Sequence, residues 1–519
     1  MSQPVAVAER IGERRGVWLA VGTITALALV LRAVASQQAL AGDELYTYRV
    51  VSAASLGGVF DGIELTEATP PLYYVLAWLA GMLGDAPGWI RLPSILYGAA
   101  SVPVVYLLGE RFGGRRAGLV AALLIAVAPF AIVYGSEARA YGGLLFLLPL
   151  STYALLRATD ERGGEGRGAL GWWVLLWVAT TAALYTHYTA SFAIVVQALW
   201  VLWRRRESFP ALAGAYLAVA VAYLPWLGEV GQNPDLAVPA PFGLFDIEPL
   251  GRLLGGHPGE PLGELPGFVG ALLLAAAAAV VAYGIFELLR RATPRGRRRW
   301  SESLLVGAGR RPGLVLLAAL AIALPLGLGI YSEIRTPLLN PRNLTGALPY
   351  LLVLVGVLTA VIRPPLTALA AGLATLALAL GSASVLAGEA QRPQWKAAAE
   401  LIEAEAEPGS TVVYVSLAGI FRPGNDPSGP FASADEHPLV QELPLYIDEG
   451  FELERDVNDE KAWRGGGTVY VAYPRLPLFE AAVREQAERS GAVLESRTVL
   501  EGQTPIVVSA FAAGAGQAP

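Results

Sequence analysis

The sequence predicts an α-helical protein that crosses a membrane about eleven times and carries a small α/β domain at its C-terminal end. Of the 519 residues, 54% are hydrophobic and only 16% are charged, whereas soluble domains have about 25% charged residues. The apolar residues form long blocks, which excludes disordered and collagen-like chains. Residues 388–519 lack such blocks and contain 21 acidic and 10 basic residues.

A helix needs about 20 apolar residues to span a membrane. The first apolar block could be a cleaved signal peptide, but its length favours a retained anchor. The block Leu72–Leu83 has only about a dozen residues, so we expect an interfacial helix there. Spanning helices are predicted near residues 17–38, 92–109, 118–134, 141–157, 170–187, 190–203, 210–228, 268–290, 313–331, 347–362 and 365–387.

The arginines predict the orientation of these helices. Cytoplasmic loops carry an excess of positive charge. Arginines cluster before the first predicted span and after the second, fourth, sixth and eighth, and the single Arg363 follows the tenth. We therefore expect a cytoplasmic N-terminus, a transmembrane domain over residues 1–387 in the inner (plasma) membrane, and an extracytoplasmic domain over 388–519. In that domain, helices are expected at 395–406 and 478–490, and strands of a partly parallel sheet at 411–416, 468–473 and 506–510.

The composition excludes several kinds of site. The chain has no cysteine and three histidines, which excludes disulfides and thiolate catalysis and argues against a histidine metal cluster. Asp43, Glu44 and Glu137 could bind a divalent cation on the outside, but their spacing does not require one, so we expect no cofactor and no metal. The net charge of −6 argues against a nucleic-acid partner.

An acidic pair follows the first predicted span. Asp43 and Glu44 open the segment that leads away from the membrane on its outer side. Neighbouring residues on a helix point about 100° apart, so these two carboxylates do not flank one bond as a glycosidase pair does. One base with a supporting neighbour is the better interpretation, and simple solvated capping of the span is the alternative.

Arginines also occur on the predicted outer face, which positive charge normally avoids. Among them are Arg139, Arg335 and Arg342, at the ends of predicted spans. A guanidinium donates two parallel hydrogen bonds to a phosphate, so they favour an anionic ligand, with nonspecific contact to lipid headgroups as the alternative. His187 lies at the outer end of the fifth span and is either an interfacial residue or part of such a site.

Six short motifs occur in a fixed order: DE at 43–44, TPPLYY at 69–74, RLPS at 91–94, SEARAY at 136–141, THY at 186–188 and PRNL at 341–344. Together they resemble the dolichyl-phosphate-mannose-protein mannosyltransferase-like proteins of glycosyltransferase family 39, in the GT-C superfamily, and the related aminoarabinose transferase. The resemblance covers about residues 15–365. Thr69 stands where the family pattern has histidine, and Asn343 where it has tyrosine.

The resemblance implies a GT-C fold and the inverting transfer of a sugar from a polyprenyl-phosphate donor to a hydroxyl of a glycan, lipid or protein. It implies that Asp43 is the general base and that Arg139, His187 and Arg342 contact the phosphate. Glu44 and Tyr141 would then shape the sugar or acceptor pocket, Glu44 being counted with Asp43 in the catalytic pair. The matching motifs add Tyr73, Arg91 and Glu137 as further substrate-binding candidates.

Other functions remain open at this stage. A transporter or flippase for a lipid-linked sugar would place ionisable residues at mid-bilayer and show inverted repeats, whereas the charges here cluster at span ends. A polymerase or ligase that uses diphosphate-linked donors would also suit the outside arginines. A sensor whose acidic tail binds a partner is a third alternative.

Overall fold

The computed structural model describes residues 3–66, 69–84, 87–160, 167–229, 242–246, 248–255, 267–291, 311–335, 338–387, 392–415, 441–464, 467–501 and 504–512. The chain divides into two compact units, residues 1–36 with 68–383 and residues 37–67 with 384–519. Most of the predicted outer loop 229–267 and of the arginine-rich segment 290–311 lies outside the described residues.

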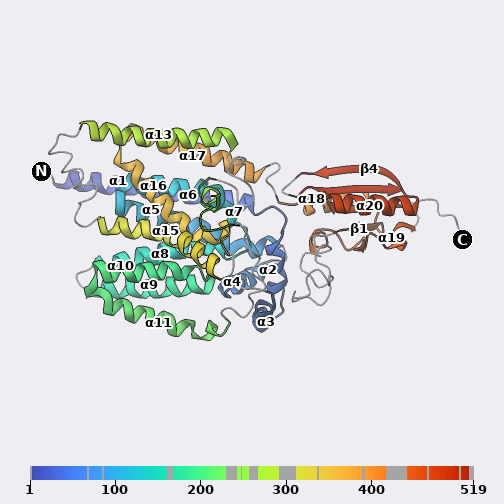
Figure 1. Cartoon of the computed structure of the whole chain (residues 1–519), viewed down its shortest axis with the longest axis horizontal. Coiled ribbons are helices and arrows are strands. Elements are labelled where there is room, and N and C mark those ends of the chain that lie inside the picture. The colour runs from blue at the N-terminus through green and yellow to red at the C-terminus, as the bar shows by residue number, and fades with distance from the viewer. Residues whose placement is uncertain are drawn as a thin grey trace. The chain divides into compact units, whose positions relative to one another are not determined.

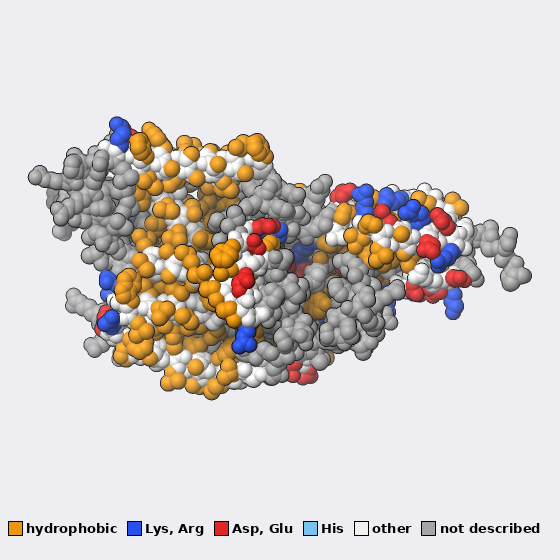
Figure 2. Space-filling model, viewed as in Figure 1, with side chains coloured by type: hydrophobic (Ala, Val, Ile, Leu, Met, Phe, Trp, Pro, Cys, Tyr) orange, Lys and Arg blue, Asp and Glu red, His pale blue; other side chains and the backbone are white. Residues whose placement is uncertain are grey.

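The first unit is a bundle of apolar helices (Figure 1). In the described part of the chain, nine segments are long and apolar enough to cross a membrane. Hydrophobic side chains cover the face of these helices that Figure 2 shows, as a lipid-facing surface requires. The helices in these segments are α1 (Gln3–Ala35), α5 (Leu92–Gly113), α8 (Tyr141–Asp160), α9 (Arg167–Thr186), α11 (Phe209–Leu227), α13 (Gly267–Arg291), α15 (Arg311–Ile334), α16 (Leu348–Val361) and α17 (Pro364–Leu386).

Two of the eleven predicted spans form shorter helices. The block at 118–134 is divided into α6 (Arg115–Val127) and α7 (Pro129–Tyr134). The block at 190–203 forms α10 (Ala190–Arg204), which has 15 residues. The predicted interfacial block forms α4 (Leu72–Gly81), whose 10 residues are too few to cross a membrane. The difference between eleven apolar blocks and nine long helices therefore comes from helix length and from one break.

A proline causes the break between α6 and α7. Pro129 has no N–H and cannot donate to the carbonyl of Ile125, four residues earlier. The fully buried Arg32 of α1 donates instead to the carbonyls of Ile125 (3.2 Å) and Ala126 (3.3 Å). Backbone groups without partners are costly inside a membrane, so Arg32 stabilises the point at which the chain leaves α6 and enters the hairpin beyond α7.

A buried hydrogen-bond network connects four helices of the bundle. Gln197 of α10 donates through Nε2 to Ser151 Oγ and Thr152 Oγ1 of α8, both at 3.0 Å. Its Oε1 accepts from the hydroxyl of Tyr216 on α11 (2.8 Å), and Thr152 is hydrogen-bonded to Tyr350 of α16 (2.8 Å). Because Gln197 is 0% exposed, this amide fixes the register of α8, α10, α11 and α16.

Replacing Gln197 by leucine is expected to lower the free energy of unfolding by about 2 kcal/mol, since three interhelical hydrogen bonds of about 0.6 kcal/mol each are lost. Thermal unfolding of the detergent-solubilised protein measures the change. Val195→Leu, at a position of α10 that is 57% exposed, is the control and should leave the melting temperature unchanged. Equal melting temperatures for all three proteins would contradict the role given to the network.

The second unit contains a five-stranded sheet with the strand order β2-β1-β3-β5-β4. Strand β1 pairs in parallel with β2 and β3, whereas β5 pairs antiparallel with β3 and β4. Helices α18 and α20 pack against opposite faces, each with its own hydrophobic cluster. The bounds are β1 (Thr411–Tyr414), β2 (Glu452–Glu454), β3 (Thr468–Pro474), β4 (Val493–Leu500), β5 (Ile506–Ala512), α18 (Trp395–Glu405), α19 (Glu460–Arg464) and α20 (Pro477–Ser490), with α2 (Asp43–Val51) and α3 (Leu56–Thr66) from the N-terminal part of this unit.

The predicted partly parallel sheet is confirmed, although its outer strands were not predicted. Strand β2 has only three residues, and the first five residues of β4 are exposed. An exposed edge strand lacks the apolar alternation on which strand prediction depends. The predicted helices and strands at 395–406, 468–473, 478–490 and 506–510 all form, and 411–416 forms over its described part.

Candidate active site

The nine predicted site residues occur in both units, and each group is described within its own unit. Asp43 and Glu44 belong to the second unit. The first unit contains the remaining seven, Tyr73, Arg91, Glu137, Arg139, Tyr141, His187 and Arg342.

Arg139 lies in the hairpin between α7 and α8 and is 8% exposed. Its carbonyl accepts from Ser94 Oγ (2.9 Å), and its N–H donates to the carbonyl of Glu137 (2.7 Å). Its guanidinium carbon lies 5.9 Å from the ring centre of Tyr74, whose hydroxyl is hydrogen-bonded to Thr69 (2.7 Å). A cation over an aromatic ring is attracted by the electrons of that ring. The RLPS motif therefore holds the backbone of Arg139, and the TPPLYY motif holds its side chain.

Tyr73 and Arg91 are buried and donate to backbone carbonyls. Each is 1% exposed. The Tyr73 hydroxyl donates to the carbonyl of Ile90 (2.8 Å), and Arg91 donates to the carbonyl of Ser36 (2.6 Å), just beyond the end of α1. Burial raises the pKa of Tyr73, so its hydroxyl stays protonated and remains a donor. We therefore expect both side chains to position the backbone around the site.

His187 directly follows α9 and is 7% exposed. The backbone N–H of Thr189 donates to Nδ1 (3.3 Å), which places the imidazole proton on Nε2. Burial lowers the pKa of His187 to about 3, and the charges of Arg139 and Arg342 add to this effect. The ring of Tyr141 lies 5.6 Å away, centre to centre. The imidazole is thus neutral at physiological pH and shares one neighbourhood with two guanidinium groups.

Arg342 is held by the turn that surrounds it. It lies in the 3-10 helix η5 (Pro341–Ala347), where Asn340 Oδ1 accepts from its N–H (3.2 Å) and Thr345 Oγ1 donates to its carbonyl (2.5 Å). Asn343, one of the two departures from the family pattern, donates to the carbonyl of Leu338 (2.8 Å). At this position the asparagine therefore stabilises the turn that presents Arg342.

The lowered pKa of His187 predicts a pH-dependent stability. The folded protein resists protonation of this imidazole, whereas the unfolded chain takes up a proton below about pH 6.5. The contribution of His187 to the free energy of unfolding is therefore complete above about pH 6.5 and is lost as the pH falls towards about 3. At about pH 5 the loss is roughly 2 kcal/mol. Thermal unfolding as a function of pH should show a shallower loss in His187→Asn than in the wild type. Parallel profiles would contradict a neutral, buried His187.

Asp43 and Glu44 are the first two residues of α2. Gly42 precedes them with φ 53° and ψ −123°, a backbone conformation that glycine adopts more readily than other residues. Asp43 is half-buried, whereas Glu44 is 0% exposed and forms an ion pair with Arg392. Burial lowers the pKa of Arg392 to about 10, so its guanidinium remains charged at neutral pH. Of the two predicted carboxylates, Asp43 is the more accessible.

The cluster in the first unit has the chemistry of an anion site. Two arginines supply positive charge and N–H donors, and the neutral histidine supplies a further N–H donor, a combination that suits a phosphate. Among the described residues, no three histidine, cysteine, aspartate or glutamate side chains are grouped so as to hold a metal ion. The absence of a cofactor stays a prediction.

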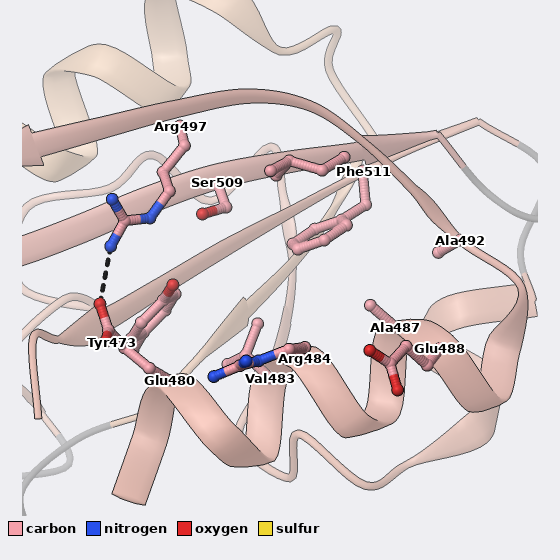
Figure 3. A pocket seen from close by; sticks show the side chains of 11 residues that line it. Tyr473, Glu480, Val483, Arg484, Ala487, Glu488, Ala492, Arg497, Ser509 and Phe511 are labelled. Carbon is pink, nitrogen blue, oxygen red and sulfur yellow. Dashed lines mark hydrogen bonds and ion pairs between the residues drawn. The ribbon is translucent and has the colours of Figure 1, made fainter. Parts of the chain in front are cut away.

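A separate groove of about 370 Å³ lies in the second unit, between α20 and strands β4 and β5 (Figure 3). Its walls include Val483, Leu494 and Phe511, and an ion pair between Arg497 and Glu480 (2.6 Å) lies at its side. None of the nine predicted site residues lines this groove.

Residues 68–227 match the family described as dolichyl-phosphate-mannose-protein mannosyltransferase. A segment of 197 residues is 31% identical to the undecaprenyl phosphate-alpha-4-amino-4-deoxy-L-arabinose arabinosyl transferase of Pseudomonas aeruginosa (strain LESB58) and covers 36% of this chain. A segment of 95 residues is 30% identical to the putative mannosyltransferase YkcB of Bacillus subtilis (strain 168), covering 18% of this chain and 13% of that protein. The match to the arabinosyl transferase spans 35% of that protein's length.

The fold is similar to that in the crystal structure of ArnT from Cupriavidus metallidurans bound to undecaprenyl phosphate, with a TM-score of 0.52 over 94% of this chain and 97% of the other, at 16% identity. The chain has the GT-C fold. The GT-C resemblance predicted from the six motifs is confirmed. The family match contains the TPPLYY, RLPS, SEARAY and THY motifs of this chain, whereas DE at 43–44 and PRNL at 341–344 lie outside it.

Proposed function

We propose that the protein is a multi-pass membrane glycosyltransferase that transfers a sugar from a polyprenyl-phosphate donor to an acceptor hydroxyl. The observation that carries this proposal is a fold similar to that of ArnT, in a chain where the charges of Arg139 and Arg342 act on the buried His187. The curated relatives named for undecaprenyl-phosphate-linked arabinose support the same class of donor. The acceptor is a glycan, a lipid or a protein.

In the proposed reaction, Asp43 removes the proton from the acceptor hydroxyl, and the resulting oxygen attacks the anomeric carbon from the side opposite the phosphate. The bond between the anomeric carbon and the phosphate oxygen breaks, so polyprenyl phosphate leaves with the bonding electron pair. One displacement inverts the anomeric configuration. The charge that develops on the leaving phosphate is stabilised by Arg139 and Arg342. The guanidinium of Arg139 lies over the ring of Tyr74, and the backbone of Arg342 is held by its turn.

The neutral imidazole of His187 suits a donor role in this scheme. Its Nδ1 accepts from Thr189, which leaves the Nε2 hydrogen for a phosphate oxygen. Glu137 lies in the hairpin that contains Arg139, and Tyr141 is the first residue of α8. We assign both to the sugar or acceptor pocket. The apolar bundle supplies the surroundings that a polyprenyl chain requires. With the predicted orientation, catalysis takes place on the outer face of the inner membrane.

The decisive experiment is a transfer assay with the full-length protein in lipid nanodiscs. Undecaprenyl-phosphate mannose, glucose and 4-amino-4-deoxyarabinose, each radiolabelled in the sugar, are incubated with and without an extract of acceptor membranes. Release of undecaprenyl phosphate together with label on the acceptor is the expected result. Movement of intact donor between leaflets, without any cleavage, would overturn the proposal in favour of a transporter.

A further inference from the structure

Glu44 carries a buried charge that the proposed chemistry does not use. Its partner Arg392 lies 348 residues further along the chain, between α17 and α18, and the Arg392 side chain is 14% exposed. A buried ion that loses its partner destabilises its surroundings strongly. Each of the two side chains therefore requires the other, and Glu44 is adjacent to the proposed base.

The segment before α2 is bound to the same unit by three further hydrogen bonds. Gln38 Nε2 donates to the carbonyl of Val385 (3.1 Å), and Gln38 Oε1 accepts from the backbone N–H of Arg392 (3.0 Å). The backbone N–H of Leu40 donates to the hydroxyl of Tyr446 (2.6 Å). Residues 38–44 are thus held at three points by residues of the C-terminal part of the chain.

We propose that Arg392 is a positioning residue that fixes the first turn of α2 through Glu44 and thereby holds the Asp43 carboxylate in place. This inference rests on the proposed function for the role of Asp43 as the base. Glu44 and Asp43 share one helical turn, so a displacement of Glu44 moves Asp43 with it. A base must lie within hydrogen-bond reach of the proton it removes. The C-terminal part of the chain therefore contributes to the reaction by geometry, without contacting the substrate.

The local backbone makes this anchor necessary. Helix α2 has nine residues and no side-chain cap at Gly42. Helices shorter than about 12 residues are marginal without tertiary contacts. The buried ion pair lies in the first turn of α2, where such a contact has the largest effect on the Asp43 backbone.

Hydrogen–deuterium exchange on the full-length protein in nanodiscs tests the anchor independently of activity. Arg392→Gln is expected to accelerate exchange of the α2 amides, residues 45–51, by at least about tenfold, because the turn opens locally. Arg475→Gln, at an exposed arginine of the same unit, is the matched control and should leave α2 unchanged. Equal exchange of α2 in the wild type and in Arg392→Gln would overturn the proposal.

The transfer assay adds a readout that a purely structural role would not move. Arg392→Gln and Glu44→Gln should each lower kcat by about 10- to 100-fold while KM for the donor changes little, since only the base is misplaced. The double variant replaces the ion pair by two amides and should recover most of the lost turnover, as should Arg392→Lys. Additive losses in the double variant would contradict the pairing.

These readouts separate the two proposals. If the wild type releases no polyprenyl phosphate but α2 loosens in Arg392→Gln, the anchor stands and the transferase function fails. If the wild type is active and Arg392→Gln keeps both the α2 exchange and kcat of the wild type, the anchor fails and the transferase function stands.

Discussion

Replacing Asp43 by asparagine is expected to lower the turnover of sugar transfer by about 100- to 10,000-fold, the usual contribution of a general base. Asparagine keeps the size of the side chain but is neutral and cannot take up the proton of the acceptor. Asp43 is half-buried at the start of α2, so the variant should fold normally. Release of undecaprenyl phosphate in the nanodisc assay measures the effect.

Two controls test whether the loss of turnover is specific to the Asp43 carboxylate and independent of lipid binding. Asp61→Asn, at an exposed position of α3 in the same unit, removes a carboxylate without touching α2 and should keep full activity. Binding of undecaprenyl phosphate should be the same in Asp43→Asn and in the wild type, because the phosphate ligands are untouched. An Asp43→Asn variant that retains most of the wild-type turnover would exclude Asp43 as the base.

Two arginines of the candidate site share one property that can be read from the sequence. Arg139 and Arg342 lie on the predicted outer face, where the positive-inside rule makes an arginine unexpected. Together with His187 they belong to motifs in a fixed order, and the structure places both guanidinium groups close enough to lower the pKa of that histidine. An exception to the positive-inside rule therefore marked these two arginines as candidates, and their role stays a prediction.

The supporting residues could not be predicted because their partners are remote. Arg32 lies within an apolar block and reaches carbonyls 93 and 94 residues away. Gln197 lies among apolar residues of α10, and its partners lie on two other helices, α8 and α11. Arg392 pairs with Glu44, which lies 348 residues earlier in the chain. No local pattern encodes such contacts, since they depend on how the helices pack.

The helix breaks had a partial sequence signal. Pro129 predicts the end of a helix at the preceding residues, yet an apolar block of adequate length was interpreted as one span. Proline alone does not decide the matter, because Pro103 and Pro149 lie inside continuous helices. What differs at Pro129 is the partner for the released carbonyls, which Arg32 provides.

Removal of either guanidinium group is expected to weaken the binding of undecaprenyl phosphate. A hydrogen bond to a charged group contributes about 1.5 to 3 kcal/mol, so Arg139→Gln and Arg342→Gln should each raise Kd by about 10- to 100-fold. Arg342→Lys keeps the charge but loses the forked geometry, so its Kd should lie between those of the wild type and Arg342→Gln. Titration of the lipid into nanodiscs that contain each variant measures Kd.

The matched control is Arg335→Gln. Arg335 also lies on the predicted outer face, but it is exposed and, unlike Arg139 and Arg342, does not affect the pKa of His187, so this variant should bind the lipid as the wild type does. Undecaprenol, which lacks the phosphate, should bind equally to all variants, because it contacts only the apolar bundle. If Arg139→Gln and Arg342→Gln weakened the binding of undecaprenol and of undecaprenyl phosphate to the same extent, the two arginines would stabilise the fold and would not contact the phosphate. A loss confined to the phosphate-bearing lipid is expected if their guanidinium groups contact the phosphate, because only that lipid carries the charge to which they donate.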